Sequence, residues 1–332
     1  MSLDLANKEV WMFIGFTVVV GVMLYVDLFL VNRKARVVPV RDALIWSAIW
    51  IGTSLLFNVF VYLELGQTKA FEYLAAYLVE KSLSVDNLFV FLVVFTYFGI
   101  APMYQPRVLR WGILGAVVLR AILIVIGVEL IHAFNWMLYV FGIILILTAF
   151  KLVRGVEGSV EPGKNPALRL IARFVPLTTE LHQEKFLVRL NQVLYATPLL
   201  ATLVVIETTD VMFALDSIPA VLGISHDLFI AYTSNIFAIL GLRALYFALA
   251  GIMDLFHYLK YSLAIILGFI GVKMLIHDIY KIPTEIALGV VFILLALAIV
   301  ASLMFPEKKK DESAMSDLEP VPVAVEVSET EG

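Results

Sequence analysis

Two apolar stretches of this chain carry carboxylates at positions where a membrane-spanning helix would lie. The first reads Glu80-Lys-Ser-Leu-Ser-Val-Asp86-Asn-Leu-Phe89, and the second reads Glu207-Thr-Thr-Asp210-Val-Met-Phe213-Ala-Leu-Asp216-Ser-Ile-Pro219. A carboxylate near the middle of a bilayer costs roughly 2.5 to 3.5 kcal/mol on insertion scales. Because that cost is high, these five acids predict a polar site that binds a cation.

The side chains around these acids are hard oxygen donors. Besides the carboxylates, the two stretches supply an amide and several hydroxyls, among them Asn87, Ser82, Ser84, Thr209 and Ser217. Donors of this type suit Mn²⁺, Mg²⁺ or Ca²⁺ better than zinc or copper, which usually recruit histidine or cysteine. The predicted metal ligands are Glu80, Asp86, Asn87, Glu207, Asp210 and Asp216.

The acids do not share one face of a straight helix. In the second stretch, Glu207 and Asp210 fall on one face at 100° per residue, and Asp216 falls on another. Pro219 has no amide hydrogen, so the carbonyl of Leu215 loses its helical partner beside Asp216. We therefore expect an unwound or kinked segment there, which would turn Asp216 inward and line a polar cavity.

Three basic residues also lie within the predicted membrane core, namely Lys81, Arg120 and Arg243. Five acids against three bases leave two negative charges uncompensated, which a bound divalent cation or protons would neutralise. Alternatively, each arginine pairs with a carboxylate and serves only to hold the bundle together. Asn58, in another apolar run, either forms a hydrogen bond across helices or lines the pathway.

The composition is that of a membrane protein. Hydrophobic residues make up 61% of the 332 residues and charged residues only 16%, whereas an ordinary soluble domain has about 45 to 50% apolar residues. The first apolar run begins at Val10 and carries Asp27 near its end, so it is too long and too acidic for a cleavable signal peptide. The absence of cysteine removes disulfides and thiol chemistry. No nucleic-acid partner is expected.

Apolar windows long enough to cross a ~30 Å hydrocarbon core predict an all-α polytopic membrane protein with about nine transmembrane helices. The windows are residues 10–31, 42–65, 74–98, 108–131, 134–154, 197–222, 228–250, 257–277 and 283–305. Within the mixed-charge linker at 155–196, residues 167–174 and 184–194 are candidate interfacial amphipathic helices. The polar, acidic residues 306–332 predict a disordered cytoplasmic tail.

Basic residues alternate between successive loops and predict the orientation. Arg33 and Arg36 follow the first helix, Arg107 and Arg110 follow the third, and the long linker and the segment after the ninth helix are also basic. Loops rich in Lys and Arg remain in the cytoplasm. We therefore expect a multi-pass protein of the cell inner membrane, with the N-terminus outside and the C-terminus in the cytoplasm.

The two acidic stretches belong to a longer internal repeat. Asp86 matches Asp210, and Leu119-Arg-Ala121 matches Leu242-Arg-Ala244 at a nearly constant offset. The repeat units are residues 74–154 and 197–277, preceded by two helices in 1–73 and followed by the ninth helix in 278–305. Because each unit has three helices, the second unit is inverted relative to the first, as in many secondary transporters. We therefore expect Asp86 and Asp210 to meet near the middle of the membrane.

The motifs resemble those of a known family. The first acidic stretch, Leu194-Tyr-Ala-Thr-Pro198 and Thr209-Asp-Val-Met-Phe-Ala-Leu-Asp-Ser-Ile-Pro-Ala220 are similar to the TerC family, most closely its Alx branch of bacterial inner-membrane proteins. The resemblance implies a protein related to manganese exporters, with Glu80, Asp86, Glu207, Asp210 and Asp216 as ion-handling residues. That branch also has the label of a membrane-bound redox modulator, which the missing cysteines do not support.

The leading hypothesis is a secondary transporter that exports a divalent cation, foremost Mn²⁺, from the cytoplasm in exchange for protons. Mn²⁺ is then the substrate, no cofactor is bound permanently, and the lipid bilayer is the other partner. Carboxylates must be ionised to coordinate metal, so binding should weaken as the pH falls. The alternative is an accessory or sensory membrane protein that responds to metal or pH. An enzyme is not expected, because neither Gly-x-Gly-Asp nor Asp-Asp-x-x-Asp is present.

Overall fold

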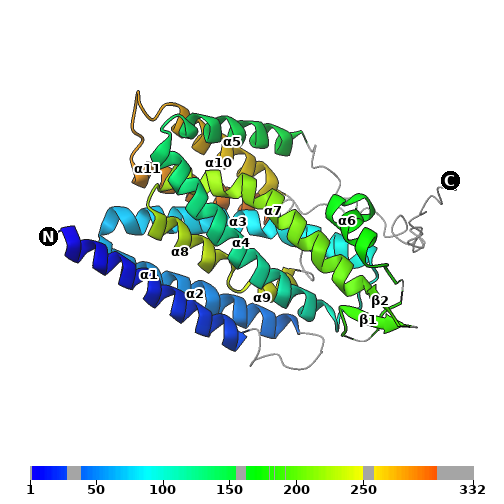
Figure 1. Cartoon of the computed structure of the whole chain (residues 1–332). Helices are drawn as coiled ribbons and strands as arrows, with labels where there is room; N and C mark the ends of the chain where they lie inside the picture. Colours follow the sequence, from blue (N-terminus) through cyan, green and yellow to red (C-terminus); the bar gives the residue numbers. More distant parts are fainter. Residues whose placement is uncertain are drawn as a thin grey trace.

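The computed structural model describes residues 2–27, 39–154, 162–178, 180–182, 184–190, 192–249 and 258–304. Within these ranges, the side chains of residues 2–9, 86, 89, 164 and 249 are outside the description. The predicted tail at 306–332 and most of the basic loop after the first helix also lie outside the described residues. The described part is mostly helical, and its long helices form one bundle (Figure 1).

The helices follow the predicted apolar windows. They are α1 (Ser2–Tyr25), α2 (Val40–Leu65), α3 (Gln67–Tyr97), α4 (Gln105–Ala133), α5 (Met137–Val153), α6 (Pro166–Phe174), α7 (Pro198–Ile224), α8 (Leu228–Ile239), α9 (Leu242–Leu249), α10 (Leu259–Leu275) and α11 (Thr284–Met304), with a short 3₁₀ turn, η2, at Pro162–Lys164. Among the described residues, five segments are long and apolar enough to cross a membrane: α2, α4, α7, Leu228–Ala248 and α11. The protein is therefore a polytopic helical membrane protein, and the remaining crossings stay predictions.

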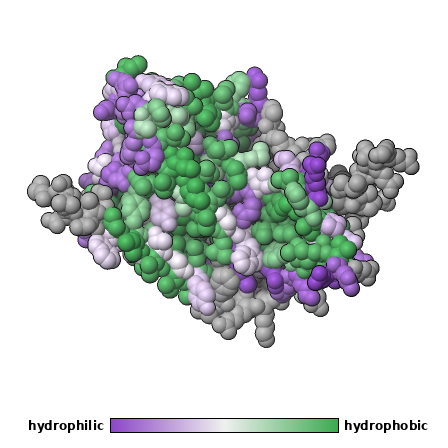
Figure 2. All heavy atoms as spheres, viewed as in Figure 1, coloured by the Kyte–Doolittle hydropathy of each residue, from purple (hydrophilic) through white to green (hydrophobic). Residues whose placement is uncertain are grey.

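The outer surface of the bundle is apolar. Large side chains such as Trp11, Leu56 and Phe292 are 70%, 72% and 62% exposed, respectively. Figure 2 shows hydrophobic residues over the middle of one face and hydrophilic residues mostly toward its two ends. Contiguous apolar surface of this kind marks contact with a membrane or a partner, and here it covers helices of membrane-spanning length.

The helices that carry the acidic stretches lie in the centre of the bundle. α3 packs against α7, α4 packs against both α7 and α8, and α8 packs against α3. α5 and α10 lie together on one side (Figure 1). Their closest approach is at Gly142 and Gly271, where a Cβ on Gly142 would lie 3.0 Å from the carbonyl oxygen of Gly271. Glycine at these two positions lets the two backbones come into contact.

Within the described residues, one of the predicted apolar helices is interrupted, and it is not the helix in which the sequence predicts the break. α7 continues from Pro198 to Ile224 with Pro219 inside it, so the expected unwound segment beside Asp216 is wrong. The predicted helix at 228–250 instead divides into α8 and α9. At the break, Gly241 has a φ of +80°, and a Cβ there would lie 2.7 Å from a ring carbon of Trp50 in α2. Both the left-handed backbone and the close contact require glycine.

The linker contains one of the two amphipathic helices that the sequence predicts. α6 begins after Asn165, whose side-chain oxygen accepts hydrogen bonds from the backbone N–H groups of Ala167 (2.9 Å) and Leu168 (3.2 Å). An asparagine in this position satisfies amide groups that have no partner within the helix. Pro166 at the first helical position has no amide hydrogen to satisfy. The prediction of a helix at 167–174 is therefore confirmed.

The second predicted amphipathic helix, at 184–194, is wrong. This segment contains strand β1 (Leu187–Leu190), which pairs antiparallel with β2 (Val193–Ala196). Gln192 has a φ of +67° in the turn between them, a backbone conformation that a helix excludes. The side chains of β1 alternate between exposed and half-buried, so the apolar pattern has the period of a strand.

Candidate functional site

A buried cluster of charged side chains joins α3, α4 and α7. Arg120 of α4 forms ion pairs with Glu80 of α3 and Asp210 of α7. Its Nη2 lies 2.8 Å from Oδ1 of Asp210, and its Nε lies 3.2 Å from Oδ2. Arg120 and Glu80 are fully buried, and Asp210 is 4% exposed. The planar guanidinium thus binds the carboxylate of Asp210 in a bidentate manner and also pairs with the carboxylate of Glu80 from another helix.

Asn87 completes what we call the Arg120 cluster, defined as Glu80, Asn87, Arg120 and Asp210. In the amide orientation that satisfies both ends, its nitrogen donates to the carbonyl of Leu83 (3.1 Å) and its oxygen accepts from Nη2 of Arg120 (3.3 Å). One guanidinium against two carboxylates leaves one net negative charge among these side chains. Asp86 precedes Asn87 in α3, but its side chain is outside the described set.

Two of the predicted hydroxyl ligands have no hydrogen-bond partner among the described residues. Ser84 of α3 is fully buried and Ser217 of α7 is 2% exposed, and neither oxygen is satisfied. Thr209 and Ser82 differ, because each donates to the carbonyl four residues earlier in its own helix. Ser84 and Ser217 are therefore the hydroxyls that are free to bind a ligand.

The structure separates the two remaining described acids from Arg120. Glu207 is half-buried and lies against Gly115 of α4, where an added Cβ would overlap its carboxylate. Asp216, also half-buried, accepts a hydrogen bond from the hydroxyl of Thr148 in α5 (2.9 Å). Neither acid forms an ion pair within the described part of the chain. Of the predicted carboxylate ligands that the structure describes, Glu80 and Asp210 thus contact Arg120, whereas Glu207 and Asp216 do not.

Four of the five predicted acids have described side chains, and these four do not converge on one point; a site that includes Asp86 stays a prediction. Among the residues that the structure describes, no group of three or more His, Asp or Glu side chains is placed to hold a metal ion. The reason is geometric, because the continuous α7 points Asp216 toward α5 and Arg120 lies between Glu80 and Asp210. Any metal at the Arg120 cluster would have to replace the guanidinium.

The count of five acids against three bases, made from the sequence, does not tell which acid each base contacts. Arg243 of α9 pairs with Asp27, whose Oδ1 lies 2.7 Å and whose carbonyl oxygen lies 2.8 Å from its Nη2. Lys81 donates to two backbone carbonyls and contacts no described carboxylate. Asn58 keeps a buried amide oxygen without a partner among the described residues. Among Lys81, Arg120 and Arg243, only Arg120 thus pairs with described predicted site acids.

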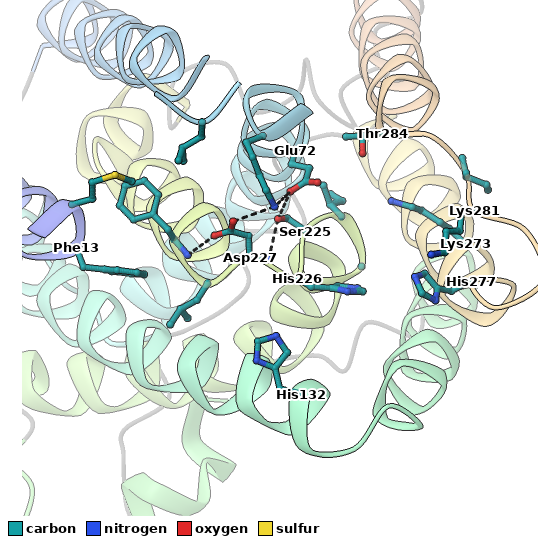
Figure 3. Close-up of a pocket in the computed structure, with 18 of the residues that line it drawn as sticks. Phe13, Glu72, His132, Ser225, His226, Asp227, Lys273, His277, Lys281 and Thr284 are labelled. Carbon is teal, nitrogen blue, oxygen red and sulfur yellow. Dashed lines mark hydrogen bonds and ion pairs between the residues drawn. The ribbon is translucent and has the colours of Figure 1, made fainter. Parts of the chain in front are cut away.

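A pocket of about 780 Å³ lies at the end of the bundle where α3 and α8 begin and where α4, α7 and α10 end (Figure 3). We call it the histidine pocket, and its polar lining residues are Lys69, Glu72, His132, Ser225, His226, Asp227, Lys273, His277, Tyr280, Lys281 and Thr284. Lys69 forms ion pairs with Glu72 (3.0 Å) and Asp227 (3.1 Å). The sequence did not predict that three histidines, His132, His226 and His277, line one pocket.

His226 lies in the loop between α7 and α8 and faces the other basic groups of the pocket. Its ring centroid is 5.9 Å from that of His277. Burial lowers the pKa of His226 below its usual value, and the nearby His277 and Lys273 lower it further, while Glu72 acts in the opposite direction. His226 is therefore neutral over a wider pH range than a solvated histidine.

Comparison with known proteins agrees with this architecture. Residues 65–310 match the family described as "Integral membrane protein TerC family". The chain is 48% identical over 295 residues to "Putative membrane-bound redox modulator Alx" of Salmonella typhi, covering 86% of this chain and 92% of that protein. A protein of the same name from Escherichia coli (strain K12) is 46% identical with the same coverage. The relative of that name from Photorhabdus laumondii is 42% identical over 308 residues, covering 90% and 96% of the two chains.

No solved structure matches the chain significantly. The family match covers more than half of the 332 residues, and the relatives cover most of them. The name that these relatives share agrees with the resemblance of the acidic motifs to the Alx branch of the TerC family. The protein belongs to the TerC family of integral membrane proteins.

Proposed function

We propose that this protein is a secondary transporter that exports a divalent cation, foremost Mn²⁺, from the cytoplasm in exchange for protons. The observation that carries the proposal is the Arg120 cluster, in which carboxylates from α3 and α7 meet in the interior of a membrane protein. Ionisable groups buried at membrane depth are expensive and mark ion pathways. Other buried oxygen donors of the same two helices, Asn87, Ser84 and Ser217, suit a hard cation.

In this proposal, Arg120 occupies the place that the transported cation takes in another state. The guanidinium is always protonated, so it cannot leave the carboxylates by losing its proton. It has to be withdrawn by movement of α4 relative to α3 and α7. Glu80, Asp210 and Asn87, with the free hydroxyls of Ser84 and Ser217, then supply the oxygen ligands of the ion. The described conformation corresponds to the ion-free state.

The proposal includes nine membrane crossings and an inverted repeat formed by α3–α5 and α7–α10. The pattern of helix contacts supports it, because the corresponding helices of the two units pack in pairs: α3 on α7, α4 on α8 and α5 on α10. The cross-contact of α4 with α7 has its counterpart in that of α3 with α8. A two-fold relation between the units would produce this pattern. We place the protein in the inner membrane, with the N-terminus outside.

We assign the proton-carrying role to Glu207 and Asp216. Both are half-buried carboxylates of α7 that have no described arginine or lysine partner within ion-pair distance. A carboxylate that binds metal must be ionised, so protons that enter from the outside compete with the cation. Proton entry through α7 would thus release the metal from Asp210 in the same helix.

Metal flux into proteoliposomes that contain only this protein tests the proposal. We expect Mn²⁺ to move when a pH gradient is imposed, ahead of Mg²⁺, Ca²⁺ and Zn²⁺. Asp210→Asn should reduce the rate at least about tenfold, which corresponds to about 1.4 kcal/mol of lost binding or activation free energy. Asp278→Asn is a matched control, because Asp278 is exposed at one end of the bundle. Mn²⁺ flux through Asp210→Asn at the wild-type rate would contradict the proposal.

A second candidate is an accessory or sensory protein that responds to metal or pH. The histidine pocket favours it, because His132, His226 and His277 share one pocket and histidine changes charge near neutral pH. It predicts no metal flux by the protein alone. The name of the relatives refers to redox modulation, but a chain without cysteine has no thiol to perform it.

A further inference from the structure

The break between α8 and α9 exposes backbone carbonyls inside the bundle. α8 ends at Ile239 and α9 begins at Leu242, within an apolar segment that is long enough to cross a membrane. The last carbonyls of a helix have no partner within it, and the aligned peptide dipoles give this end a partial negative charge. Ala238 and Leu240 are both nearly inaccessible to solvent. These carbonyls therefore need a donor or a cation.

Lys81 of α3 supplies that cation. Its Nζ lies 3.0 Å from the carbonyl oxygen of Ala238 and 3.3 Å from that of Leu240. No described carboxylate lies within ion-pair distance of Lys81. The preceding residue, Glu80, contacts Arg120 instead, since consecutive residues of a helix point about 100° apart. A single positive charge is thus held by neutral oxygens at the end of a half-helix.

A further buried oxygen lies on the same helix. Asn235 of α8 is fully buried, and neither its amide oxygen nor its amide nitrogen has a hydrogen-bond partner among the described residues. A buried polar group without a partner costs about 1 to 3 kcal/mol. Asn235 precedes Ala238 by three residues, so it lies about one turn earlier on the same side of α8. Within the described part of the chain, the Asn235 amide is thus available to a ligand.

We propose that the α8–α9 break is a binding site for a monovalent cation such as Na⁺ or K⁺, and that the Lys81 ammonium is its tethered occupant in this conformation. The carbonyls of Ala238 and Leu240 and the amide oxygen of Asn235 are the ligands. Carbonyls freed by a broken membrane helix coordinate alkali cations in other transporter folds. A monovalent ion fits because the ligands are neutral, whereas a divalent ion needs carboxylates to offset its desolvation.

Lys81→Met tests the site, because methionine removes the ammonium and keeps a long, unbranched side chain. The full-length protein in detergent is melted in NaCl, in KCl and in choline chloride of equal ionic strength. We expect Na⁺ or K⁺ to raise the Tm of Lys81→Met relative to choline, and the wild type to show little difference. Binding of radioactive Na⁺ should be at least about tenfold tighter in Lys81→Met than in the wild type.

Two controls separate a cation site from a general effect of charge. The double variant Lys81→Met/Asn235→Leu should lose the response to Na⁺ and K⁺. Lys69→Met, which removes another lysine of α3, should not acquire it. A folded Lys81→Met that melts identically in all three salts overturns the proposal, and Lys81 is then only a cap for α8.

If Lys81→Met cannot be purified in choline chloride, the purification is repeated in NaCl and in KCl. Recovery of folded protein only with an alkali cation supports the site, and failure in all salts contradicts it. The experiment measures binding of a monovalent cation to the purified protein. A negative result therefore does not contradict the proposal of divalent export. Failure of divalent export likewise leaves this site standing.

Discussion

The Arg120 cluster and the histidine pocket handle charge in opposite ways. In the cluster, Arg120 is enclosed by carboxylates and an amide, and its own side chain is inaccessible to solvent. In the pocket, Lys69 pairs with Glu72 and Asp227, while Lys273 and the histidines border open space. The acids expected to bind ions are thus closed off by an internal cation, and the open volume lies at one end of the bundle. A transporter at rest without its ion would have this arrangement.

The largest expected effect comes from removing the internal cation. Arg120→Met leaves Glu80 and Asp210 buried without a counter-charge, which costs about 3 to 5 kcal/mol in cases of this kind. We expect a lower Tm in EDTA and a larger rise in Tm with MnCl₂ than the wild type shows. Thermal unfolding in the two buffers measures both.

Arg243→Met is the matched control for that experiment. It breaks the buried pair with Asp27, so it should also lower the Tm. Asp27 and Arg243 are not part of the Arg120 cluster, so Mn²⁺ should not restore the stability of this variant. Equal responses of the two variants to Mn²⁺ would show that the cluster does not bind the metal.

A smaller effect is expected where α4 packs against Glu207 of α7. At Gly115 of α4, a Cβ would overlap the carboxylate of Glu207, so Gly115→Ala forces α4 or Glu207 to move. Overpacking of this type costs about 1 to 3 kcal/mol. The free energy of unfolding of Gly115→Ala should fall by this amount.

Gly289→Ala is the control, because a Cβ at Gly289 in α11 meets nothing within 4 Å. Alanine is better than glycine in a helix by about 0.8 to 1.0 kcal/mol, so this variant should equal or exceed the wild type in stability. If Gly115→Ala is as stable as Gly289→Ala, Glu207 does not pack against α4 as described.

The smallest effect concerns the pocket. Burial and the neighbouring His277 and Lys273 hold the pKa of His226 below its usual value. Below about pH 6.5, this histidine binds a proton in the unfolded chain but stays neutral in the folded protein. The free energy of unfolding therefore falls as the pH drops below about 6.5. His226→Gln should lose less Tm than the wild type between about pH 7.5 and about pH 5.5.

His182→Gln is the control for the pH experiment. His182 lies in the linker and does not line the pocket, so its replacement should leave the acid sensitivity unchanged. An acid-induced loss of Tm in His226→Gln that is as large as in the wild type would show that His226 is solvated.

Most helices could be predicted from the sequence because long apolar runs are a local signal. The break at Gly241 could not, because Leu240-Gly-Leu242 looks ordinary and its requirement for glycine comes from contact with Trp50 of α2. The hairpin was missed for another reason. Short apolar runs such as Leu187–Leu190 have too few residues to distinguish the period of a strand from that of a helix.

The site could be predicted in part. The repeat predicted that Asp86 and Asp210 meet, and this pair stays a prediction because the side chain of Asp86 is outside the described residues. The acid of α3 that the structure places beside Asp210, across Arg120, is Glu80. Whether Arg120 pairs with them stayed open, because spacing along the chain does not tell which helix faces which. The prediction for Asp216 depended on an unwound α7, and the helix is continuous. The converging histidines share one weak signal, their position in loops that are poor in Lys and Arg.

The most direct measurement is equilibrium binding of Mn²⁺ to the purified wild-type protein and to Asp210→Asn, followed by the paramagnetic resonance of the free ion. Asp210 is held by Arg120 in the described state, and in the proposed mechanism it becomes a metal ligand when the guanidinium withdraws. We predict that Asp210→Asn weakens Mn²⁺ binding at least about tenfold, while Asp278→Asn leaves it unchanged. Wild-type affinity in Asp210→Asn would contradict the account.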